Sequence, residues 1–121
     1  MKKILVVDDD LAVCNMLEKF LIKKDYHAVI ALSGEEAIRK VEEERPHVVL
    51  LDIKMPGMDG VETLKKIREI DKEVGIVMIT AVKEEETGKK CLELGAYDYI
   101  TKPLSLDYLE TVLMVKLLDF S

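Results

Sequence analysis

Four consecutive large apolar residues, Val48 to Leu51, constrain the fold of this 121-residue chain more than any other stretch. Pro46 precedes them, and Asp52 and then a Pro56-Gly57 turn follow. A short unbroken apolar run between such boundaries is typical of a strand buried on both faces, as in the interior of a parallel sheet. In open α/β sheets the ligand crevice lies outside the carboxyl ends of the strands. The run therefore places the Asp52 carboxylate where such folds carry out chemistry.

Strands and helices are expected to alternate along the whole chain. Apolar runs predict strands over residues 4–7, 26–32, 48–52, 75–79 and 97–101, and apolar residues at helical spacing predict helices over 11–24, 34–45, 60–70, 84–94 and 105–118. Asp10 and Ser33 are the expected N-caps of the first two helices, and Gly95 the expected residue after the fourth. Short loops between alternating elements predict one α/β domain over residues 1–121, with helices on both faces of a parallel sheet.

Four of the five expected strands end in a polar or reactive side chain. In chain order these are Asp8 with Asp9, Asp52, Thr80 and Lys102. The second strand ends near Leu32 without such a group, which fits a position at the edge of the sheet. A doubly wound five-stranded parallel sheet with the strand order 2-1-3-4-5, flanked by five helices, brings the other four strand ends to one crevice.

Three carboxylates in one crevice need a positive partner. Two like charges 4 Å apart repel by roughly 4 kcal/mol at an effective dielectric constant near 20, so either the pKa values rise or a cation binds. Carboxylate oxygens suit Mg²⁺ better than Zn²⁺, which prefers His or Cys. The two histidines, His27 and His47, do not lie at the carboxyl ends of strands. We therefore expect Mg²⁺ as the cofactor.

A cation, a lysine and a hydroxyl at one site favour phosphoryl chemistry. Lys102 supplies a second positive charge, and Thr80 can donate a hydrogen bond to a phosphoryl oxygen; phosphoryl transfer requires such charge-stabilising groups. The sequence has no Gly-rich phosphate-binding loop, so a nucleotide is not the expected substrate. A carboxylate in such a site can itself be the nucleophile. Asp52 is the candidate, because it ends the central strand.

These motifs resemble those of the receiver domain of bacterial two-component response regulators, a family with a flavodoxin-like fold. The resemblance extends from Lys3 to about Leu118. The segments that carry it are Ile4-Leu5-Val6-Val7-Asp8-Asp9, Leu50-Leu51-Asp52, Met55-Pro56-Gly57-Met58-Asp59-Gly60, Ile79-Thr80-Ala81, Gly95-Ala96 and Tyr99-Ile100-Thr101-Lys102-Pro103. It implies a signalling switch that modifies itself, and not an enzyme that turns over a substrate.

The resemblance also implies how the acidic residues act. Asp52 would accept a phosphoryl group from a phosphohistidine of a sensor histidine kinase. Asp9, Asp52 and the backbone carbonyl of Lys54 would bind Mg²⁺ directly, and Asp8 would bind it through water. Lys102 would then pair with the phosphoryl group on Asp52.

The switch and the lifetime of the signal are implied in the same way. Thr80 would move to bond the phosphoryl group, Tyr99 would move inward behind it, and the Lys102–Pro103 peptide bond is expected to be cis. Lys54 and Val82 would flank the path of an attacking water. Because neither is an acid or an amide that orients this water, we expect slow self-dephosphorylation.

The last predicted helix is more apolar than one buried face requires. Its apolar residues are Leu106, Leu109, Val112, Leu113, Val115, Leu117, Leu118 and Phe120. The excess, together with Met114, predicts either a homodimer or partner contact, or a contact with an output domain; a helix that only covers the core is equally consistent with it. Residues 84–94 and 97–101 would form the remainder of the surface that transmits the signal.

Two other functions are open from the residues. A Mg²⁺-dependent aspartate-nucleophile phosphohydrolase usually carries a second Asp two residues after the nucleophile, where this chain has Lys54. A flavodoxin-like cofactor binder would need a phosphate-binding loop after the first strand, where Asp8, Asp9 and Asp10 would repel phosphate.

Composition excludes several partners. The net charge of −6 does not suggest direct nucleic-acid binding. No apolar run approaches the roughly 18 residues of a membrane span, and the first strand is too short for the core of a signal peptide. Cys14 and Cys91 have no metal or redox spacing, so we expect buried, reduced thiols in a cytoplasmic protein.

Overall fold

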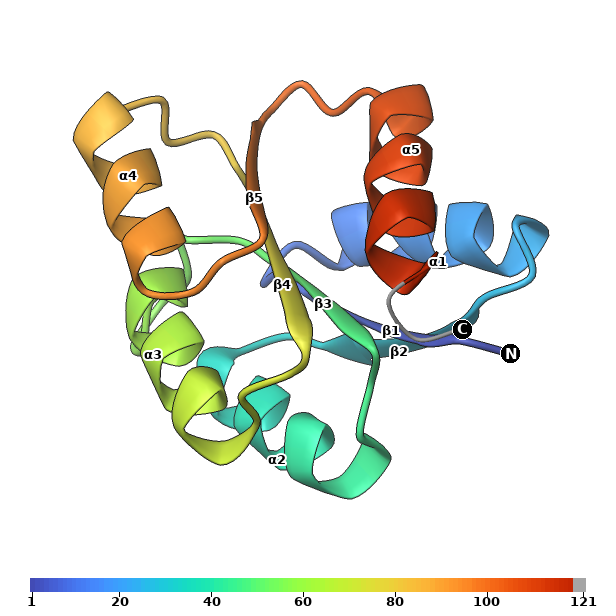
Figure 1. The fold of residues 1–121 in the computed structure, drawn as a ribbon, viewed down its shortest axis with the longest axis horizontal. Coiled ribbons are helices and arrows are strands. Elements are labelled where there is room, and N and C mark those ends of the chain that lie inside the picture. The colour runs from blue at the N-terminus through green and yellow to red at the C-terminus, as the bar shows by residue number, and fades with distance from the viewer. Residues whose placement is uncertain (119–121) are drawn as a thin grey trace.

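The computed structural model, which describes residues 1–118, has a parallel sheet between two layers of helices (Figure 1). The strands are β1 (Lys3–Val7), β2 (His27–Ala31), β3 (Val48–Leu51), β4 (Gly75–Thr80) and β5 (Asp98–Thr101). The helices are α1 (Leu11–Lys23), α2 (Gly34–Glu44), α3 (Gly60–Ile70), α4 (Glu85–Glu93) and α5 (Leu106–Leu117). All neighbouring strands pair in parallel, in the order β2-β1-β3-β4-β5. The predicted doubly wound sheet and its strand order are confirmed.

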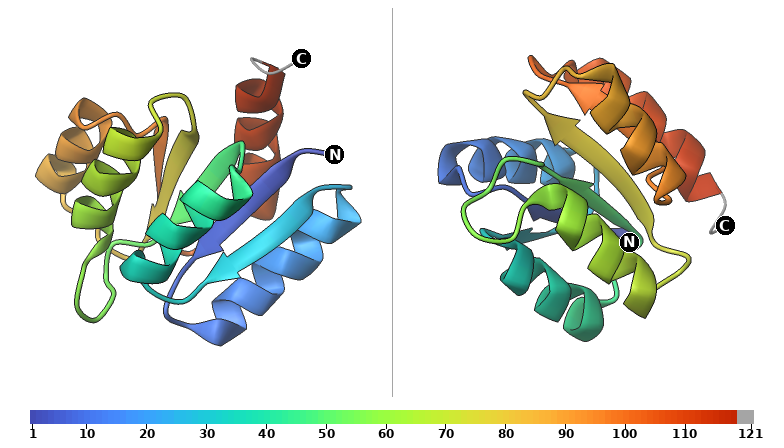
Figure 2. Two further views of the ribbon diagram at one scale, coloured as in Figure 1. Left: turned by 90° about the horizontal axis from the view of Figure 1, so that it is seen from below. Right: turned by 90° about the vertical axis from the view of Figure 1, so that its left-hand side faces the viewer.

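Successive residues of the central strands face two separate cores. Val49 and Leu51 of β3 pack in the core covered by α2, α3 and α4, whereas Val48 and Leu50 pack in the core covered by α1 and α5. Figure 2 shows these two groups of helices on opposite sides of the sheet. All four residues of β3 are buried, which is why the strand is apolar without alternation.

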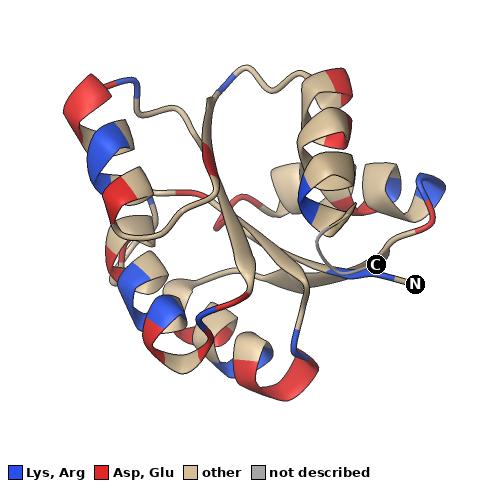
Figure 3. Cartoon of the chain, viewed as in Figure 1, with Lys and Arg blue, Asp and Glu red and all other residues tan. Residues whose placement is uncertain are grey.

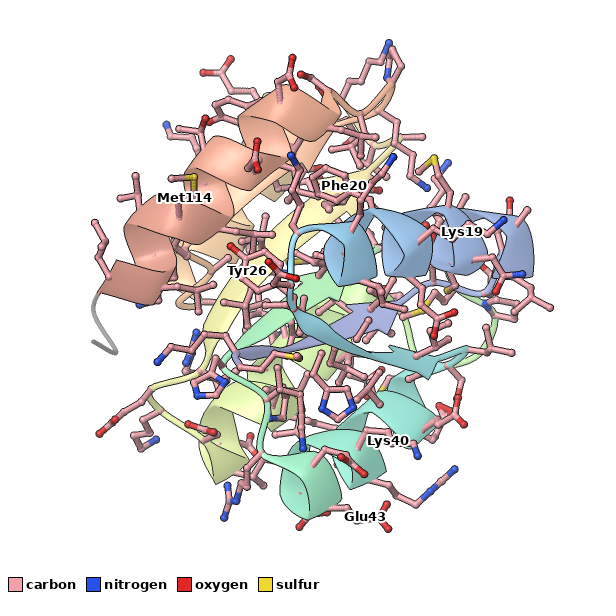
Figure 4. The ribbon with its side chains drawn as sticks, turned by 90° about the vertical axis from the view of Figure 1, so that its right-hand side faces the viewer. Lys19, Phe20, Tyr26, Lys40, Glu43 and Met114 are labelled. Carbon is pink, nitrogen blue, oxygen red and sulfur yellow. The ribbon has the colours of Figure 1, made fainter. Side chains whose placement is uncertain are left out.

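Local hydrogen bonds cap the helix ends, and the helices pack on their neighbours. The Asp10 side chain accepts from the Ala12 N–H (3.0 Å), and the Ser33 hydroxyl accepts from the Glu36 N–H (3.1 Å), so both predicted N-caps are confirmed. The Glu36 side chain in turn accepts from the N–H of Leu32, the residue before the cap (2.6 Å). On the other side of the sheet, Phe20 and Tyr26 lie between α1 and α5 (Figure 4).

Several element ends differ slightly from the prediction. Strand β2 covers residues 27–31, because it pairs with the five residues of β1. Strand β3 ends at Leu51, so Asp52 is the first residue of the following loop. Helix α5 ends at Leu117, and Phe120 of the predicted apolar helix lies outside the described residues. Within residues 1–118, none of the helices has the length and apolar character that crossing a bilayer requires.

Candidate functional site

The turn between β1 and α1 fixes the Asp8 carboxylate. The Asp8 N–H donates to the carbonyl of Ala31 (3.2 Å), its Oδ1 accepts from the Asp10 N–H (2.9 Å), and the Cys14 thiol donates to its carbonyl (3.3 Å). The residue is only 4% exposed. Burial raises the pKa of the Asp8 carboxyl and outweighs the hydrogen bonds from Asp10 and Lys102, which lower it.

Asp52 meets Asp8 because β1 and β3 are neighbours in the sheet. The register places Val7 opposite Leu51, so the residues that follow each strand lie side by side. One oxygen from each of Asp8, Asp9 and Asp52 lies within 4.8 Å of the others. Asp52 is 7% exposed, whereas Asp9 is open to solvent. The structure thus brings the three predicted carboxylates together.

Lys102 reaches this acidic cluster, defined as Asp8, Asp9 and Asp52, from the end of β5. Its Nζ lies 3.2 Å from Asp8 Oδ2 and 3.6 Å from Asp52 Oδ2. Burial works to lower the pKa of the Lys102 ammonium, but the two carboxylates outweigh burial and raise it. The ammonium therefore stays charged and neutralises part of the cluster. The Lys102–Pro103 peptide bond is cis, in agreement with the sequence expectation.

Thr80 and Tyr99 are joined through one residue of the loop between β4 and α4. Thr80 is fully buried, and its hydroxyl oxygen accepts from the Val82 N–H (3.3 Å), which leaves the O–H as a donor. The Tyr99 hydroxyl donates to the Val82 carbonyl (2.7 Å), and the tyrosine ring packs against buried core residues. The backbone of β5 also meets β4 here, since the Lys102 N–H donates to the Thr80 carbonyl (2.8 Å).

The loop after β3 runs against the start of α3. The Gly60 N–H donates to the carbonyl of Ile53 (2.8 Å). A Cβ at Gly60 would overlap the carbonyl oxygen of Asp52 and lie 2.6 Å from the Cα of Ile53. Lys54 lies in the same loop with an exposed side chain. Glycine at position 60 therefore permits the close approach that holds the backbone of Asp52.

The histidines lie away from the cluster, as expected. His47 precedes β3 at the amino end of the sheet, where its Nδ1 accepts from the Lys3 N–H (3.0 Å). His27 is the first residue of β2 and is exposed. Sequence reasoning missed two supports of the site, the Cys14 thiol and Gly60. Only Gly60 had a signal, as a glycine at the first position of a predicted helix.

Comparison with known proteins identifies the family. The family model described as the response regulator receiver domain matches residues 4–114. The chain belongs to this family. The sporulation initiation phosphotransferase F of Bacillus subtilis is 39% identical over 106 residues, covering 88% of this chain and 86% of that protein. The chain is therefore a receiver domain, which acts as a phosphoryl-accepting switch in two-component signalling.

Other similar proteins are longer. The alkaline phosphatase synthesis transcriptional regulatory protein PhoP of B. subtilis is 43% identical over 104 residues, covering 86% of this chain but 43% of that protein. The chain thus spans less than half of the length of this relative.

Solved receivers share the fold. A two-component response regulator from Clostridium difficile superimposes with a TM-score of 0.93 at 32% identity, covering 97% of this chain and 96% of that one. A chain of the CheX-CheY-BeF3-Mg complex from Borrelia burgdorferi has a TM-score of 0.90 at 33% identity, covering 94% and 87%.

Proposed function

We propose that Asp52 accepts a phosphoryl group from a phosphohistidine of a sensor histidine kinase and that this modification controls a partner or an output domain. The observation that carries the proposal is the position of the Asp52 carboxylate. It lies at the carboxyl end of the central strand, within 4.8 Å of Asp8 and Asp9 and 3.6 Å from the Lys102 ammonium. A nucleophilic oxygen is thereby placed beside an ammonium that can neutralise phosphoryl oxygens and beside two carboxylates that can hold a cation.

In the proposed transfer, an Asp52 oxygen attacks the phosphorus of the phosphohistidine. The new P–O bond forms as the P–N bond breaks, and the released imidazole takes up a proton. The Lys102 ammonium neutralises charge on the transferring group, and the Thr80 hydroxyl donates to one of its oxygens. The receiver supplies these groups for its own modification and is not a turnover enzyme.

The donor set of the acidic cluster fits Mg²⁺. Its oxygens come from carboxylates, and one of them is exposed, so an ion can enter from solvent. Asp9, Asp52 and the Lys54 carbonyl would bind Mg²⁺ directly, and Asp8 would bind it through water. When bound, the ion would neutralise negative charge on the phosphoryl oxygens.

The phosphoryl group would shift the conformational equilibrium of the residues around Val82. A new acceptor near the Thr80 hydroxyl competes for that donor, and Tyr99 is bound to the same residue of the loop. A local change at Asp52 is thereby coupled to the α4, β5 and α5 surface. On this surface Met114 of α5 is 58% exposed (Figure 4), which supports a homodimer or output-domain contact. We propose no direct contact with nucleic acid or membrane.

The remaining assignments rest on the same residues. The whole chain, residues 1–121, would form one receiver unit. Two free buried cysteines, Cys14 and Cys91, support a reducing compartment, the cytoplasm. The alternative of an aspartate-nucleophile phosphohydrolase is less well supported, because the position of its general acid is the exposed Lys54.

Intact-mass measurement after incubation with Mg²⁺ and acetyl phosphate tests the proposal. We expect the wild type to gain one phosphoryl group and Asp52→Asn to gain none. Asp10→Asn is the matched control: Asp10 is an acid of the same turn that lies outside the acidic cluster and caps α1, and Asn keeps that cap. No gain in the wild type, or an equal gain in Asp52→Asn, would refute phosphorylation of Asp52.

A further inference from the structure

The two ends of α4 are held very differently. Among the helices of residues 1–118, α1, α2, α3 and α5 each have a side chain that caps the first turn, whereas Glu84 at the start of α4 makes no such bond. The first two turns of α4 contain no buried residue and include Gly88, which weakens a helix interior. The first buried residue of the helix is Cys91, in its last turn.

A groove separates the first part of α4 from α3. It has a volume of about 560 Å³ and is lined on one side by Val61, Glu62 and Lys65 of α3, and on the other by Thr87 and Lys90 of α4. Both helices carry charged residues (Figure 3), and several of them line the groove. In this part of the molecule an open groove lies between α4 and α3.

The opposite end of α4 is tied to α3 by Arg68. Its Nη2 donates to the Gly95 carbonyl directly after α4 (2.6 Å). Its Nη1 donates to the carbonyls of Val74 (2.8 Å) and Asp71 (3.3 Å), which lie between α3 and β4. One planar guanidinium therefore joins three backbone carbonyls from two connections of the fold.

Gly95 is shaped to receive this guanidinium. Its φ is +104°, which favours glycine, and a Cβ here would lie 2.9 Å from Arg68 Nε. Nε is buried and finds no acceptor within the part of the chain that the structure describes. Burial also lowers the pKa of the guanidinium, against the opposing charge of Asp71. The guanidinium therefore holds the backbone of both connections in a fixed position relative to α3.

The start of α4 is tethered in another way, through Val82. The Tyr99 hydroxyl bonds the Val82 carbonyl just before the helix, and the Tyr99 ring lies 3.5 Å from the site of a Cβ on Gly88. Tyr99 belongs to the residues that would respond to the phosphoryl group. The Tyr99 tether and the Arg68 anchor therefore lie at opposite ends of one helix.

We propose that Arg68 is a positioning residue that anchors the carboxyl end of α4, so that phosphorylation reorders residues 81–90 while residues 91–97 stay in place. The anchor itself is independent of ligand; its use in signalling rests on the proposed function. The anchor confines the response to the end of α4 that faces the acidic cluster.

Hydrogen exchange followed by mass spectrometry tests the anchor in two steps. Without any ligand, Arg68→Met should accelerate exchange in residues 91–97 by about tenfold or more, the equivalent of losing a hydrogen bond to a charged donor. Ile67→Val is the control, because it shortens a fully buried side chain next to Arg68 in the sequence and keeps the guanidinium. It should not change exchange in residues 91–97 more than elsewhere in the chain. Glu84→Ser, which adds the missing cap, should slow exchange in residues 85–88 only.

The second step adds Mg²⁺ and beryllofluoride to the wild type as a phosphoryl mimic. Exchange should change in residues 81–90 and stay the same in 91–97, and in Arg68→Met the change should spread into 91–97. An unchanged exchange of 91–97 in ligand-free Arg68→Met, or an equal response of both segments in the wild type, would overturn the anchor. If beryllofluoride leaves every peptide of the wild type unchanged, the proposed function fails, and the ligand-free comparison still decides the role of Arg68.

Discussion

Removing the charge of Asp9 should stabilise the receiver when no metal is present. Asp9 lies within 4.8 Å of both other acids of the cluster, and within residues 1–118 its side chain makes no hydrogen bond. Asp9→Asn therefore removes two repulsive pairs and breaks no contact. At 4.8 Å and the dielectric constant of water each pair costs about 0.9 kcal/mol. With salt screening, we expect the free energy of unfolding to rise by about 1 kcal/mol.

Thermal unfolding in EDTA measures this gain, which should raise the midpoint by roughly 4 °C for a chain of this size. In saturating Mg²⁺ the order should reverse, because ion binding stabilises the wild type and the amide is a poorer ligand. Asp10→Asn is the matched control, and its stability should stay near that of the wild type in both buffers. If Asp9→Asn gains nothing in EDTA, or if Mg²⁺ stabilises both proteins equally, the cluster is not a repulsive cation site.

Three further outcomes can be measured. Gly60→Ala should lower the free energy of unfolding by about 1–3 kcal/mol and slow phosphorylation, because its Cβ would overlap the Asp52 carbonyl; at Gly88 a Cβ would make only ordinary van der Waals contact with the Tyr99 ring, so a loss of stability in Gly88→Ala would contradict this reasoning. Burial, followed by the charge of Lys2, lowers the pKa of His47. The contribution of His47 to stability is therefore present above about pH 6.5 and is lost as the pH falls toward the folded pKa. In urea unfolding, His47→Asn should lose less stability than the wild type between about pH 7 and pH 5. The isolated phosphorylated receiver should keep its phosphoryl group for minutes or longer, because Val82 does not orient water; a half-life of seconds by intact mass would count against this.

The fold could be predicted because each strand appears in the sequence as its own short run of mainly apolar residues. The unbroken apolar run of Val48–Leu51 required burial on both faces, and the structure provides helices on both. Polar residues at the strand ends then indicated where a site would form. The strand ends were predicted less accurately: the prediction included Asp52 in a strand and left Thr80 out. Pairing with the neighbouring strand decides the last residue, and the sequence does not display this pairing.

The supports of the site were harder to predict. Cys14 was expected to be a small buried residue, which it is, but its bond to the Asp8 carbonyl depends on how α1 crosses β1. Arg68 has the spacing of a residue on the inner face of its helix, and its acceptors are backbone carbonyls. Every residue type has such a carbonyl, so no pattern of side chains reveals the contact.

The hydrogen bonds of Asp8 have a consequence for which ions the cluster accepts. Its N–H, its carbonyl and both carboxylate oxygens already have partners, so the side chain cannot retreat without breaking one of them. Ca²⁺ takes oxygens at about 2.3–2.6 Å and Mg²⁺ at about 2.0–2.1 Å. Asp52 is also held, by the Ile53 N–H (2.7 Å) and by Lys102 (3.6 Å), so a larger ion would have to be accommodated chiefly by the exposed side chain of Asp9. Discrimination by ionic radius would then depend on how far one solvent-facing side chain can swing.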